Sequence, residues 1–588
     1  MKKYTSPRFH PQKPASARDA VRSAEPAGLD DSAASTRRRR RLCLGAGFVL
    51  AFYVLAYLVS LGARPLVRPD EFRYAEIPRE MIASGDWISP RLLGMPYFEK
   101  PALGYQLIAA AFTLFGETRF ALRLPSALAP GLAAAMLFAL FALRTKRDWL
   151  PALAALLYLS CALVFGTGVF AVLDAPFSAA LAICLMAFFL AFSAESPASR
   201  AGWLLLAGIS AGVAFLIKGF LAFLLPALVV LPYLFFQPGQ RIHFRRLWIP
   251  AAAALLVALP WSLAILRRNP EFWKYFILVE HFQRFTAQTA DSKPEPVWYF
   301  IPVLLGGLLP TGLLALVTRG VWNRDFLRRP LVRYLLVAAA LPFLFFSASS
   351  CKLGTYILPC FPFLAGLLAL ALDDALLSRP VRTARALARL LRIWGIVLLA
   401  AVPVAYIAWM RMAGSWPSPL PPLLVLLTAA LWGAALVITA GARPLPLRFV
   451  SLFLGFALVA AAFLRAVPTV AMARKMPEDH IARCLDALHV RPGDTIFVDR
   501  QAMQAVAWTL KRSDLHLVGD TGELTYPLTR YPALEARHHE TLDAIPAAAH
   551  PPGSRIYVST SRPENFQTPA RATILARASR PGATAIRF

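Results

Sequence analysis

The chain has 588 residues, of which 57% are hydrophobic, and it carries a formal net charge of +29. Its mean hydropathy of +0.54 is too apolar for a soluble protein of this length, and uncharged apolar runs of about 20 residues recur along most of it. These runs predict a polytopic α-helical membrane protein, whereas a β-barrel would show short alternating segments. The positive charge lies mostly in short loops, which indicates membrane topology and anionic lipid rather than a nucleic-acid partner.

The first 36 residues are polar and rich in Pro, Ala and Ser, which predicts a disordered cytoplasmic tail (1–36). Five consecutive arginines (37–41) follow, directly before a long apolar run. This arrangement is typical of a first membrane helix held at the cytoplasmic face by its arginines, and not of a cleavable signal. The six cysteines are scattered and match neither a disulfide framework nor a CxxC metal site.

Residues 37–466 are the predicted transmembrane domain, with about thirteen spans. Their approximate bounds are 42–61, 121–143, 149–167, 170–192, 202–217, 219–236, 247–267, 297–318, 332–349, 356–374, 392–410, 420–440 and 447–466. With the N-terminus inside, the strongly basic loops fall on the cytoplasmic side, as the positive-inside rule requires. These loops are 144–148, 240–246, 319–329, 378–392 and 442–448. An odd number of spans places the C-terminal segment outside.

Two outer loops, about 62–120 and 268–296, retain cations on the translocated side. These cations include Arg64, Arg68, Arg73, Arg79, Arg91 and Lys100 in the first loop, and Lys274, His281, Arg284 and Lys293 in the second. Anionic substrate groups would explain them, although long loops can also cross the membrane regardless of charge. We therefore expect these two loops to carry the active site.

The first outer loop begins with RPDEFRYAEIPREM (68–81), which has the signals of a helix start. Pro69 and the two acids after it favour the N-terminal end of a helix. Asp70, Arg73 and Tyr74 then lie at i, i+3 and i+4, on one helical face. That face could offer a carboxylate, a guanidinium and a phenol to one ligand, but a capped surface helix with an ion pair has the same pattern.

Single ionisable groups stand at other apolar boundaries. In YFEKP (97–101), Glu99 could bind a divalent cation and Lys100 a phosphate, although adjacent Glu and Lys can also be solvated charges. Asp174 in VLDAPF and Lys218 in LIKGF lie at the edges of spans, where ionisable groups are costly and usually functional. The lysine could instead extend its ammonium to the membrane interface.

Two further segments carry candidate residues. SSCKLGTYILPCFP (349–362) places Lys352 and Tyr356 four residues apart, which fits an anion site or an interfacial anchor. In VEHFQRF (279–285), His281 and Arg284 are one helical turn apart. A lone histidine is more often structural, so a metal site at His281 requires a nearby carboxylate such as Glu99.

The last segment, residues 467–588, predicts a small α/β domain outside the membrane. PEDHIARCLDALHV (477–490) has the pattern of a short amphipathic helix, and DTIFVD, LHLVG and RIYVST have the pattern of short strands. The segment contains no phosphate-binding glycine loop and no metal cluster. We expect it to support or cover a site rather than to carry chemistry.

Together, these segments resemble the bacterial lipid A aminoarabinose transferases, the ArnT family of GT-C type membrane glycosyltransferases, which are related to protein O-mannosyltransferases. The resemblance is carried by PDEFRYAEIPREMIASGDW, YFEKPALGY, VLDAPF and SSCKLGTYILPCFP, in the expected order. It implies about thirteen transmembrane helices and a periplasmic α/β domain in the bacterial inner membrane. It also implies an inverting pentosyltransferase that uses an undecaprenyl phosphate–aminoarabinose donor and a lipid A acceptor, and that confers polymyxin resistance.

In the implied reaction two anionic lipids must approach each other, so stabilisation by cations is the main requirement. We expect phosphate contacts from Arg73, Lys100, Lys218, Arg284 and Lys352, and hydrogen bonds or sugar contacts from Tyr74, Tyr97 and Tyr356. Asp70 would orient the acceptor or accept its remaining proton, and Asp174 would be the second acid. Glu99 and His281 would form a divalent metal site for Zn or Mg. We expect a monomer in contact with membrane lipids.

Two other functions are compatible with the sequence. The enzyme could transfer a different sugar to protein or glycan hydroxyls, in which case Asp70 would act as a true base. A flippase for the lipid-linked sugar would instead show internal repeats and charges spread through the membrane depth. The sequence has no obvious repeat, and its charges gather outside the spans.

Overall fold

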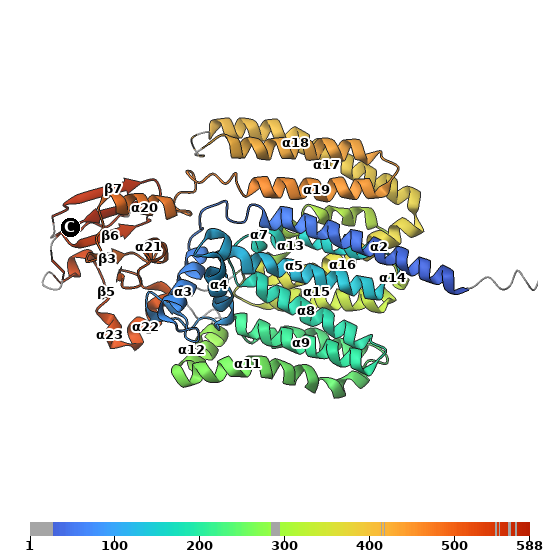
Figure 1. The fold of residues 1–588 in the computed structure, drawn as a ribbon, viewed down its shortest axis with the longest axis horizontal. Coiled ribbons are helices and arrows are strands. Elements are labelled where there is room, and N and C mark those ends of the chain that lie inside the picture. Colours follow the sequence, from blue (N-terminus) through green and yellow to red (C-terminus); the bar gives the residue numbers. More distant parts are fainter. Residues whose placement is uncertain are drawn as a thin grey trace, which may run out of the picture.

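The computed structural model describes residues 27–283, 295–546 and 550–588, apart from 413, 415, 417, 552, 562–565 and 571–572. Helices form one large bundle, and a smaller domain with a β-sheet lies at one end of it (Figure 1). Most of the predicted tail, residues 1–26, lies outside the described part of the chain. The first described helix, α2, begins at Ala27 and ends at Tyr53.

Ten helical segments in the described part of the chain are long and apolar enough to cross a membrane. They are α2 with η1 (Ser35–Leu58), α5 (Arg119–Arg144), α8 (Asp174–Phe192), α9 (Pro197–Lys218), η2 with α11 (Arg241–Arg268), α15 (Pro330–Ala348), η6 with α16 (Gly354–Ser378), α17 (Pro380–Arg411), α18 (Leu420–Ala440) and α19 (Leu445–Phe463). The predicted polytopic helical fold is therefore confirmed.

Two further spans are broken. The first consists of α6 (Leu150–Leu159) and α7 (Ala162–Gly168), with a bend of 67° between them. The second consists of Val297–Gly307 and η5 (Thr311–Thr318), with a bend of 95° between them. Its first part contains α13 (Phe300–Gly307). Counting each as one span gives twelve among the described residues, and the remaining predicted segment forms the shorter α10 (Leu221–Phe236). Each of the thirteen predicted segments thus has a helical counterpart.

The two breaks lie against each other. The N–H of Ala162 donates to the carbonyl of Leu309 at 2.7 Å, and the hydroxyl groups of Ser160 and Thr311 are 3.4 Å apart. Backbone groups inside a bilayer need a partner because no water is available to them. Each break therefore supplies a partner to the other, which permits irregular backbone within the membrane domain.

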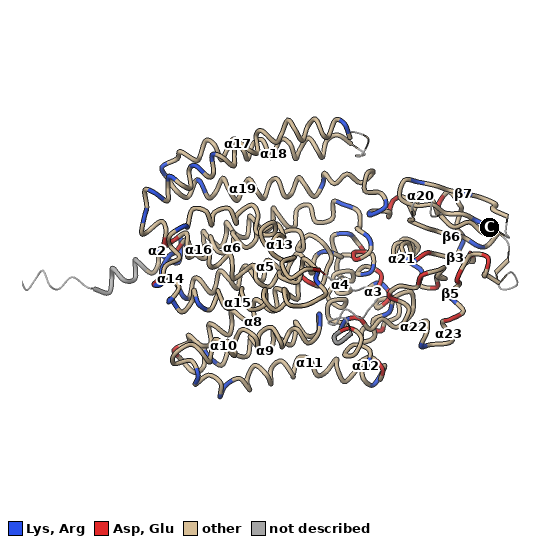
Figure 2. Tube along the Cα trace, turned by 180° about the vertical axis from the view of Figure 1, so that it is seen from behind, with Lys and Arg blue, Asp and Glu red and all other residues tan. Residues whose placement is uncertain are grey.

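Many Lys and Arg residues lie at the bundle end farthest from the C-terminal domain (Figure 2). Arg38 donates to the carbonyl groups of Ala142 and Thr145, and Arg329 pairs with Asp374 at 2.6 Å. These contacts join segments predicted to be cytoplasmic. The predicted basic loops thus lie at a common end of the bundle, and the short helix α14 (Arg324–Arg328) belongs to it.

The outer loops fold at the opposite end, next to the C-terminal domain (Figure 1). The first loop contains α3 (Asp70–Ser84), a hairpin of β1 (Arg91–Leu92) and β2 (Met95–Pro96), and α4 (Leu103–Phe115). Helix α3 ends at Ser84 and is capped by Gly85, whose φ of +67° lies in the left-handed region that glycine adopts at little cost. The second loop contributes α12 (Phe272–Ile277) and the π-helix η3 (Leu278–Gln283).

The C-terminal domain contains a six-stranded sheet in the order β5-β4-β3-β6-β8-β7. Its strands are β3 (Thr495–Val498), β4 (His516–Val518), β5 (His538–His539), β6 (Arg555–Ser559), β7 (Ala576–Arg580) and β8 (Ala583–Arg587). The first four in spatial order are parallel, and β8 and β7 complete the sheet in antiparallel pairing.

The helices of this domain are α20 (Glu478–Ala487), α21 (Met503–Leu510), α22 (Thr525–Arg530) and α23 (Pro532–Glu535), with 3₁₀ turns η8 (Gly522–Leu524) and η9 (Leu542–Ala544). The predicted helix corresponds to α20, and the three predicted strands are β3, β4 and β6. Every residue of β6 is buried, as expected for a strand inside the sheet.

Candidate active site

A cavity of about 580 Å³ opens where the outer loops meet the membrane helices. Its wall comes from α3, α7, the start of α8, the end of α9 and the segment around η6. Many predicted site residues line it: Asp70, Arg73, Tyr74, Glu99, Lys100, Asp174, Lys218 and Tyr356. Apolar side chains such as Leu163 and Phe345 complete the wall. The cavity thus brings charged groups from four distant parts of the chain beside a surface suited to lipid.

Helix α3 presents Asp70, Arg73 and Tyr74 to the cavity, as their spacing predicts. Arg73 Nη2 pairs with Asp70 Oδ1, and the Arg73 guanidinium lies 5.2 Å from the centre of the Tyr74 ring. Asp70 stands in the first turn of the helix, where the macrodipole favours a carboxylate. Its side chain is 41% exposed, so Asp70 can reach a ligand while Arg73 holds it in place.

Asp174 and Lys218 form an ion pair across the cavity wall. Asp174 is the first residue of α8 and Lys218 is the last of α9, so each charge matches the dipole of its own helix. The Lys218 ammonium also lies 4.9 Å from the centre of the Tyr356 ring and 5.3 Å from that of Phe177. Asp174 and Lys218, which the sequence shows as single charges at the edges of separate spans, are therefore partners in one ion pair.

Lys100 connects the two outer loops. Its Nζ donates to Glu280 Oε2 at 2.7 Å and to the carbonyl of Glu99 at 2.8 Å. Burial and the neighbouring Glu280 raise the pKa of the Glu99 carboxyl, and the charges of Lys100 and Arg73 only partly oppose this rise. Two carboxylates, one of them with a raised pKa, therefore face this part of the cavity.

This pair of carboxylates bears on the predicted metal site. Oxygen ligands of this kind suit a divalent cation, and Glu99 and Glu280 could contribute them. Among the residues that the structure describes, no group of three or more His, Cys, Asp and Glu side chains could hold a metal ion. The side chain of His281 and the whole of Arg284 lie outside the described residues, so their roles stay predictions.

Tyr97 and Lys352 are buried beside the cavity but do not belong to its lining. The Tyr97 hydroxyl donates to Glu523 Oε2 at 3.4 Å. Lys352 Nζ donates to the carbonyl groups of Glu295 and Ser349. In this structure Lys352 therefore braces the loop that carries Tyr356, and its phosphate contact stays a prediction.

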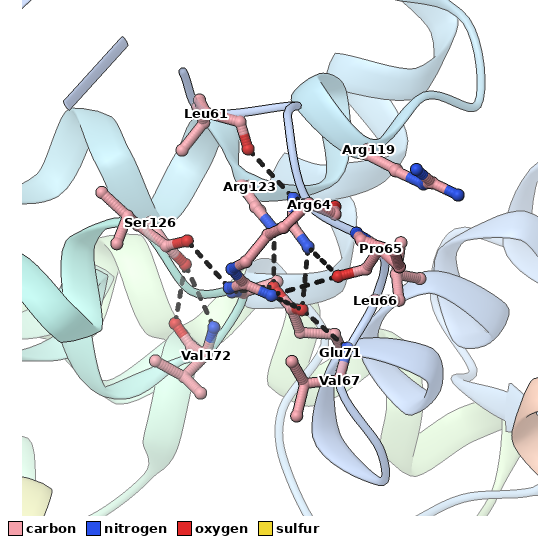
Figure 3. Close-up of polar contacts among 12 residues, drawn as sticks. Leu61, Arg64, Pro65, Leu66, Val67, Glu71, Arg119, Arg123, Ser126 and Val172 are labelled. Carbon is pink, nitrogen blue, oxygen red and sulfur yellow. Dashed lines mark hydrogen bonds and ion pairs between the residues drawn. The ribbon is translucent and has the colours of Figure 1, made fainter. Parts of the chain in front are cut away.

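Glu71, the residue after Asp70, is fully buried in a polar cluster (Figure 3). Its carboxylate accepts from Arg64 at 2.6 Å, from Arg123 at 2.7 and 2.9 Å, and from the backbone N–H groups of Val67 and Ala171. Burial alone would raise the pKa of Glu71, but Arg123 and Arg64 lower it to about 2. Glu71 thereby joins the first outer loop, α5 and the segment before Asp174.

The arginines of this cluster also bond to backbone carbonyl groups. Arg123 is fully buried and donates to the carbonyl groups of Leu61, Arg64 and Pro65 at 3.0 Å, while Arg64 donates to the carbonyl of Val169 at 3.1 Å. Arg64, which we expected to serve an anionic substrate, is thus engaged by the fold. The guanidinium of Arg79 is similarly engaged by Glu76 at 2.9 Å.

Known proteins match both parts of the chain. Residues 43–276 match the family "Dolichyl-phosphate-mannose-protein mannosyltransferase", and residues 472–550 match "Arabinosyl transferase ArnT, C-terminal domain". The "Undecaprenyl phosphate-alpha-4-amino-4-deoxy-L-arabinose arabinosyl transferase" of Yersinia enterocolitica is 35% identical over 498 residues, which are 82% of this chain and 87% of the relative. The chain belongs to this arabinosyl transferase family.

Further similarities agree with membership of the arabinosyl transferase family. The protein of the same name from Aeromonas hydrophila is 36% identical over 491 residues, covering 83% of this chain and 88% of the relative. The crystal structure of ArnT from Cupriavidus metallidurans bound to undecaprenyl phosphate superposes with a TM-score of 0.73 at 25% identity, over 92% of this chain and 97% of the other. Its apo form gives a TM-score of 0.69.

In this arabinosyl transferase, the C-terminal domain also reaches the cavity wall. Glu523 Oε2 accepts from Arg73 Nη1 at 2.5 Å, and Glu523 Oε1 accepts from Gln504. Sequence reasoning missed Glu523 because it lies in η8, outside any recognisable motif. It also missed Glu71, for which a signal existed: a buried partner is expected for an arginine such as Arg123 inside an apolar span.

Proposed function

We propose that this transferase moves 4-amino-4-deoxy-L-arabinose from undecaprenyl phosphate to a phosphate group of lipid A. The observation that carries the proposal is one cavity in which Asp70, Arg73, Asp174 and Lys218 converge beside apolar side chains. Cations next to an apolar wall suit a phosphate with a lipid chain attached. The relatives' names specify the donor and its sugar, and one crystallised relative is bound to undecaprenyl phosphate.

The proposed step exchanges one phosphate ester for another. An oxygen of the lipid A phosphate attacks the anomeric carbon of the sugar, and the bond between that carbon and the undecaprenyl phosphate oxygen breaks. Both phosphates are anions at neutral pH, so neither nucleophile nor leaving group needs a strong acid or base. The main barrier is electrostatic, and Arg73, Lys100 and Lys218 lower it by holding the two phosphates together.

The two acids have distinct roles in this proposal. Asp70 is exposed to the cavity and paired with Arg73, so it orients the acceptor phosphate or takes its remaining proton. Asp174 is held by Lys218 and contacts the amine of the sugar. A divalent ion, if bound by Glu99 and His281, would supply additional positive charge to the phosphates.

The enzyme is placed in the bacterial inner membrane with its cavity toward the periplasm. This orientation is supported by the basic loops, which gather at the bundle end opposite to the cavity and the C-terminal domain. Side chains of one chain are sufficient to form a cavity with cations beside an apolar wall, and we propose that the monomer is the active unit.

The decisive experiment incubates purified protein in lipid nanodiscs with undecaprenyl phosphate–aminoarabinose and lipid A. Mass spectrometry is expected to show lipid A with one added aminopentose. A parallel incubation adds envelope glycoproteins, and a sugar adduct on them in place of lipid A would support the alternative acceptor. The protein is also reconstituted in sealed vesicles, where donor movement across the membrane without bond transfer would overturn the proposal in favour of a flippase.

A further inference from the structure

The C-terminal domain holds α3 with one particular edge of its sheet. After β3, the carbonyl of Gln501 accepts from Arg68 Nη1 at 3.1 Å, and after β6 the Thr560 hydroxyl accepts from the same guanidinium. After β4, Glu523 accepts from Arg73. Loops at the carboxyl ends of parallel strands are where α/β domains usually bind ligands. Here that edge contacts the helix that carries the cavity acid.

Among these contacts, the one made by Glu523 reaches the cavity itself, because Arg73 lines it. The Glu523 side chain is 9% exposed and is held by Gln504 and Tyr97 as well as by Arg73. Its position is therefore set by groups from both domains. A carboxylate fixed in this way imposes its geometry on the flexible arginine that pairs with it.

Arg73 is held from two sides. Nη2 pairs with Asp70 and Nη1 pairs with Glu523, while the buried Nε–H has no hydrogen-bond partner among the described residues. The guanidinium is thus fixed and retains a donor for a ligand oxygen. Without Glu523, both Nη groups could close on Asp70 in a bidentate pair, which would remove Asp70 and Arg73 from the substrate together.

We propose that Glu523 is a positioning residue, which keeps the Arg73 guanidinium aligned with the donor phosphate and apart from a bidentate pair with Asp70. The proposal rests on the proposed function, in which Arg73 helps to hold the two phosphates together, and it further assigns Arg73 to the donor phosphate. It assigns the C-terminal domain a part in the transfer step, although none of its own residues is placed on the reacting atoms.

The test is a double-mutant cycle on the full-length protein in nanodiscs. Glu523→Gln keeps the shape of the side chain but removes its charge, and it is expected to lower kcat/KM for the donor about 10- to 100-fold, the usual cost of losing a charged hydrogen bond. In an Arg73→Gln background, the same change is expected to cost less than about twofold, because the cation that pairs with Glu523 has been removed. Glu535→Gln, an exposed acid of α23 in the same domain, is the matched control and leaves kcat/KM unchanged.

Two outcomes would overturn the proposal. One is an equal loss for Glu523→Gln in both backgrounds, and the other is a loss that is accompanied by a lower Tm and so reflects the fold. The same cycle is also measured through the Kd of undecaprenyl phosphate, followed by tryptophan fluorescence. If the unchanged protein transfers no sugar, the proposed function fails, whereas a Kd that depends on Glu523 only when Arg73 is present still supports the positioning role.

Discussion

Asp70 and Glu71 are consecutive acids on α3 with opposite surroundings. Asp70 is 41% exposed at the cavity and shares Arg73 with Glu523, whereas Glu71 is fully buried between Arg64 and Arg123. Consecutive helical positions point about 100° apart, so one helix can serve two environments. A carboxylate with every acceptor position occupied holds the fold together, while a carboxylate with an open side can receive substrate.

The largest expected effect on the transfer rate comes from substitution of Asp70, the acid exposed to the cavity. Asp70→Asn is expected to lower the transfer rate by about 10²- to 10⁴-fold, the range typical for a group that accepts a proton or orients a nucleophile. Its Tm in detergent should stay close to that of the unchanged protein, because a partly exposed site tolerates the substitution. Lipid A modification is measured by mass spectrometry, and full activity in this variant would remove Asp70 from the mechanism.

Substitution of the buried Glu71 is expected to lower stability rather than the activity of the folded protein. Glu71→Gln leaves two buried arginines without a counter-charge, which typically costs about 3–5 kcal/mol of unfolding free energy. Thermal unfolding in detergent should show a large drop in Tm, with activity lost only in proportion to folded protein.

Glu80→Gln is the matched control for that change. Burial and the neighbouring Glu76 raise the pKa of Glu80 to about 8, so the neutral amide resembles the protonated acid already present at neutral pH. Its Tm at pH 7 should hardly change. A similar drop for both variants would show that α3 tolerates no substitution at buried glutamates, and would remove the distinction drawn for Glu71.

Low pH should destabilise the buried cluster of Glu71, Arg64 and Arg123 in the protein without substrate. The pKa of Glu71 falls from 4.5 to about 2 on folding, so this residue stabilises the fold above pH 4.5, and the stabilisation disappears as the pH falls toward 2. Since one pKa unit corresponds to about 1.4 kcal/mol, the loss amounts to roughly 3 kcal/mol. Unfolding measured from pH 6 to pH 2 should show this decline, and Glu71→Gln should lack its share of it.

Substitution in the Asp174–Lys218 ion pair should lower the transfer rate less than substitution of Asp70. Lys218→Gln removes the cation that faces Asp174 and Tyr356, and we expect about a tenfold loss in transfer, the lower range for a charged hydrogen bond. This loss should appear mainly as a higher KM for the donor, with little change in kcat. Arg329→Gln, an exposed cation at the far end of the bundle, should leave both constants unchanged.

The smallest effect is expected at Glu99. A carboxylate without its own arginine can accept another cation, so Glu99→Gln should reduce the Zn or Mg that co-purifies with the protein. Elemental analysis measures this content, with Glu535→Gln, an exposed acid of α23, as the comparison that should leave it intact. Equal metal content in Glu99→Gln and in the unchanged protein would restrict Glu99 to a structural role.

Much of the fold could be predicted because membrane spans are long, uncharged segments that stand out from their surroundings. The breaks could not be predicted, since the one after Leu159 depends on a contact with Leu309 from a distant segment. The segment predicted over 219–236 illustrates the same limit, because α10 has the predicted composition but only 16 helical residues. Length and hydropathy therefore identify segments better than they identify complete crossings.

The candidate site was predictable where charge interrupts apolar sequence. Asp174 and Lys218 were found in this way, although their pairing across 44 positions was not. Glu71 does lie in the first turn of α3, as predicted, but its buried pairing with Arg123 was not predicted, because that arginine lies 52 positions later, in a membrane span. Glu523 was not recognised because its importance depends on how two domains dock, which no local pattern records.

The paired breaks in the membrane domain constrain how family members can exchange parts. A chimera that replaced only one broken span by a straight helix would leave either Ala162 or Leu309 with an unbonded backbone group inside the bilayer. Recombination should therefore succeed when segments 149–167 and 297–318 come from the same parent. The two spans must therefore be exchanged together, although they are far apart in the chain.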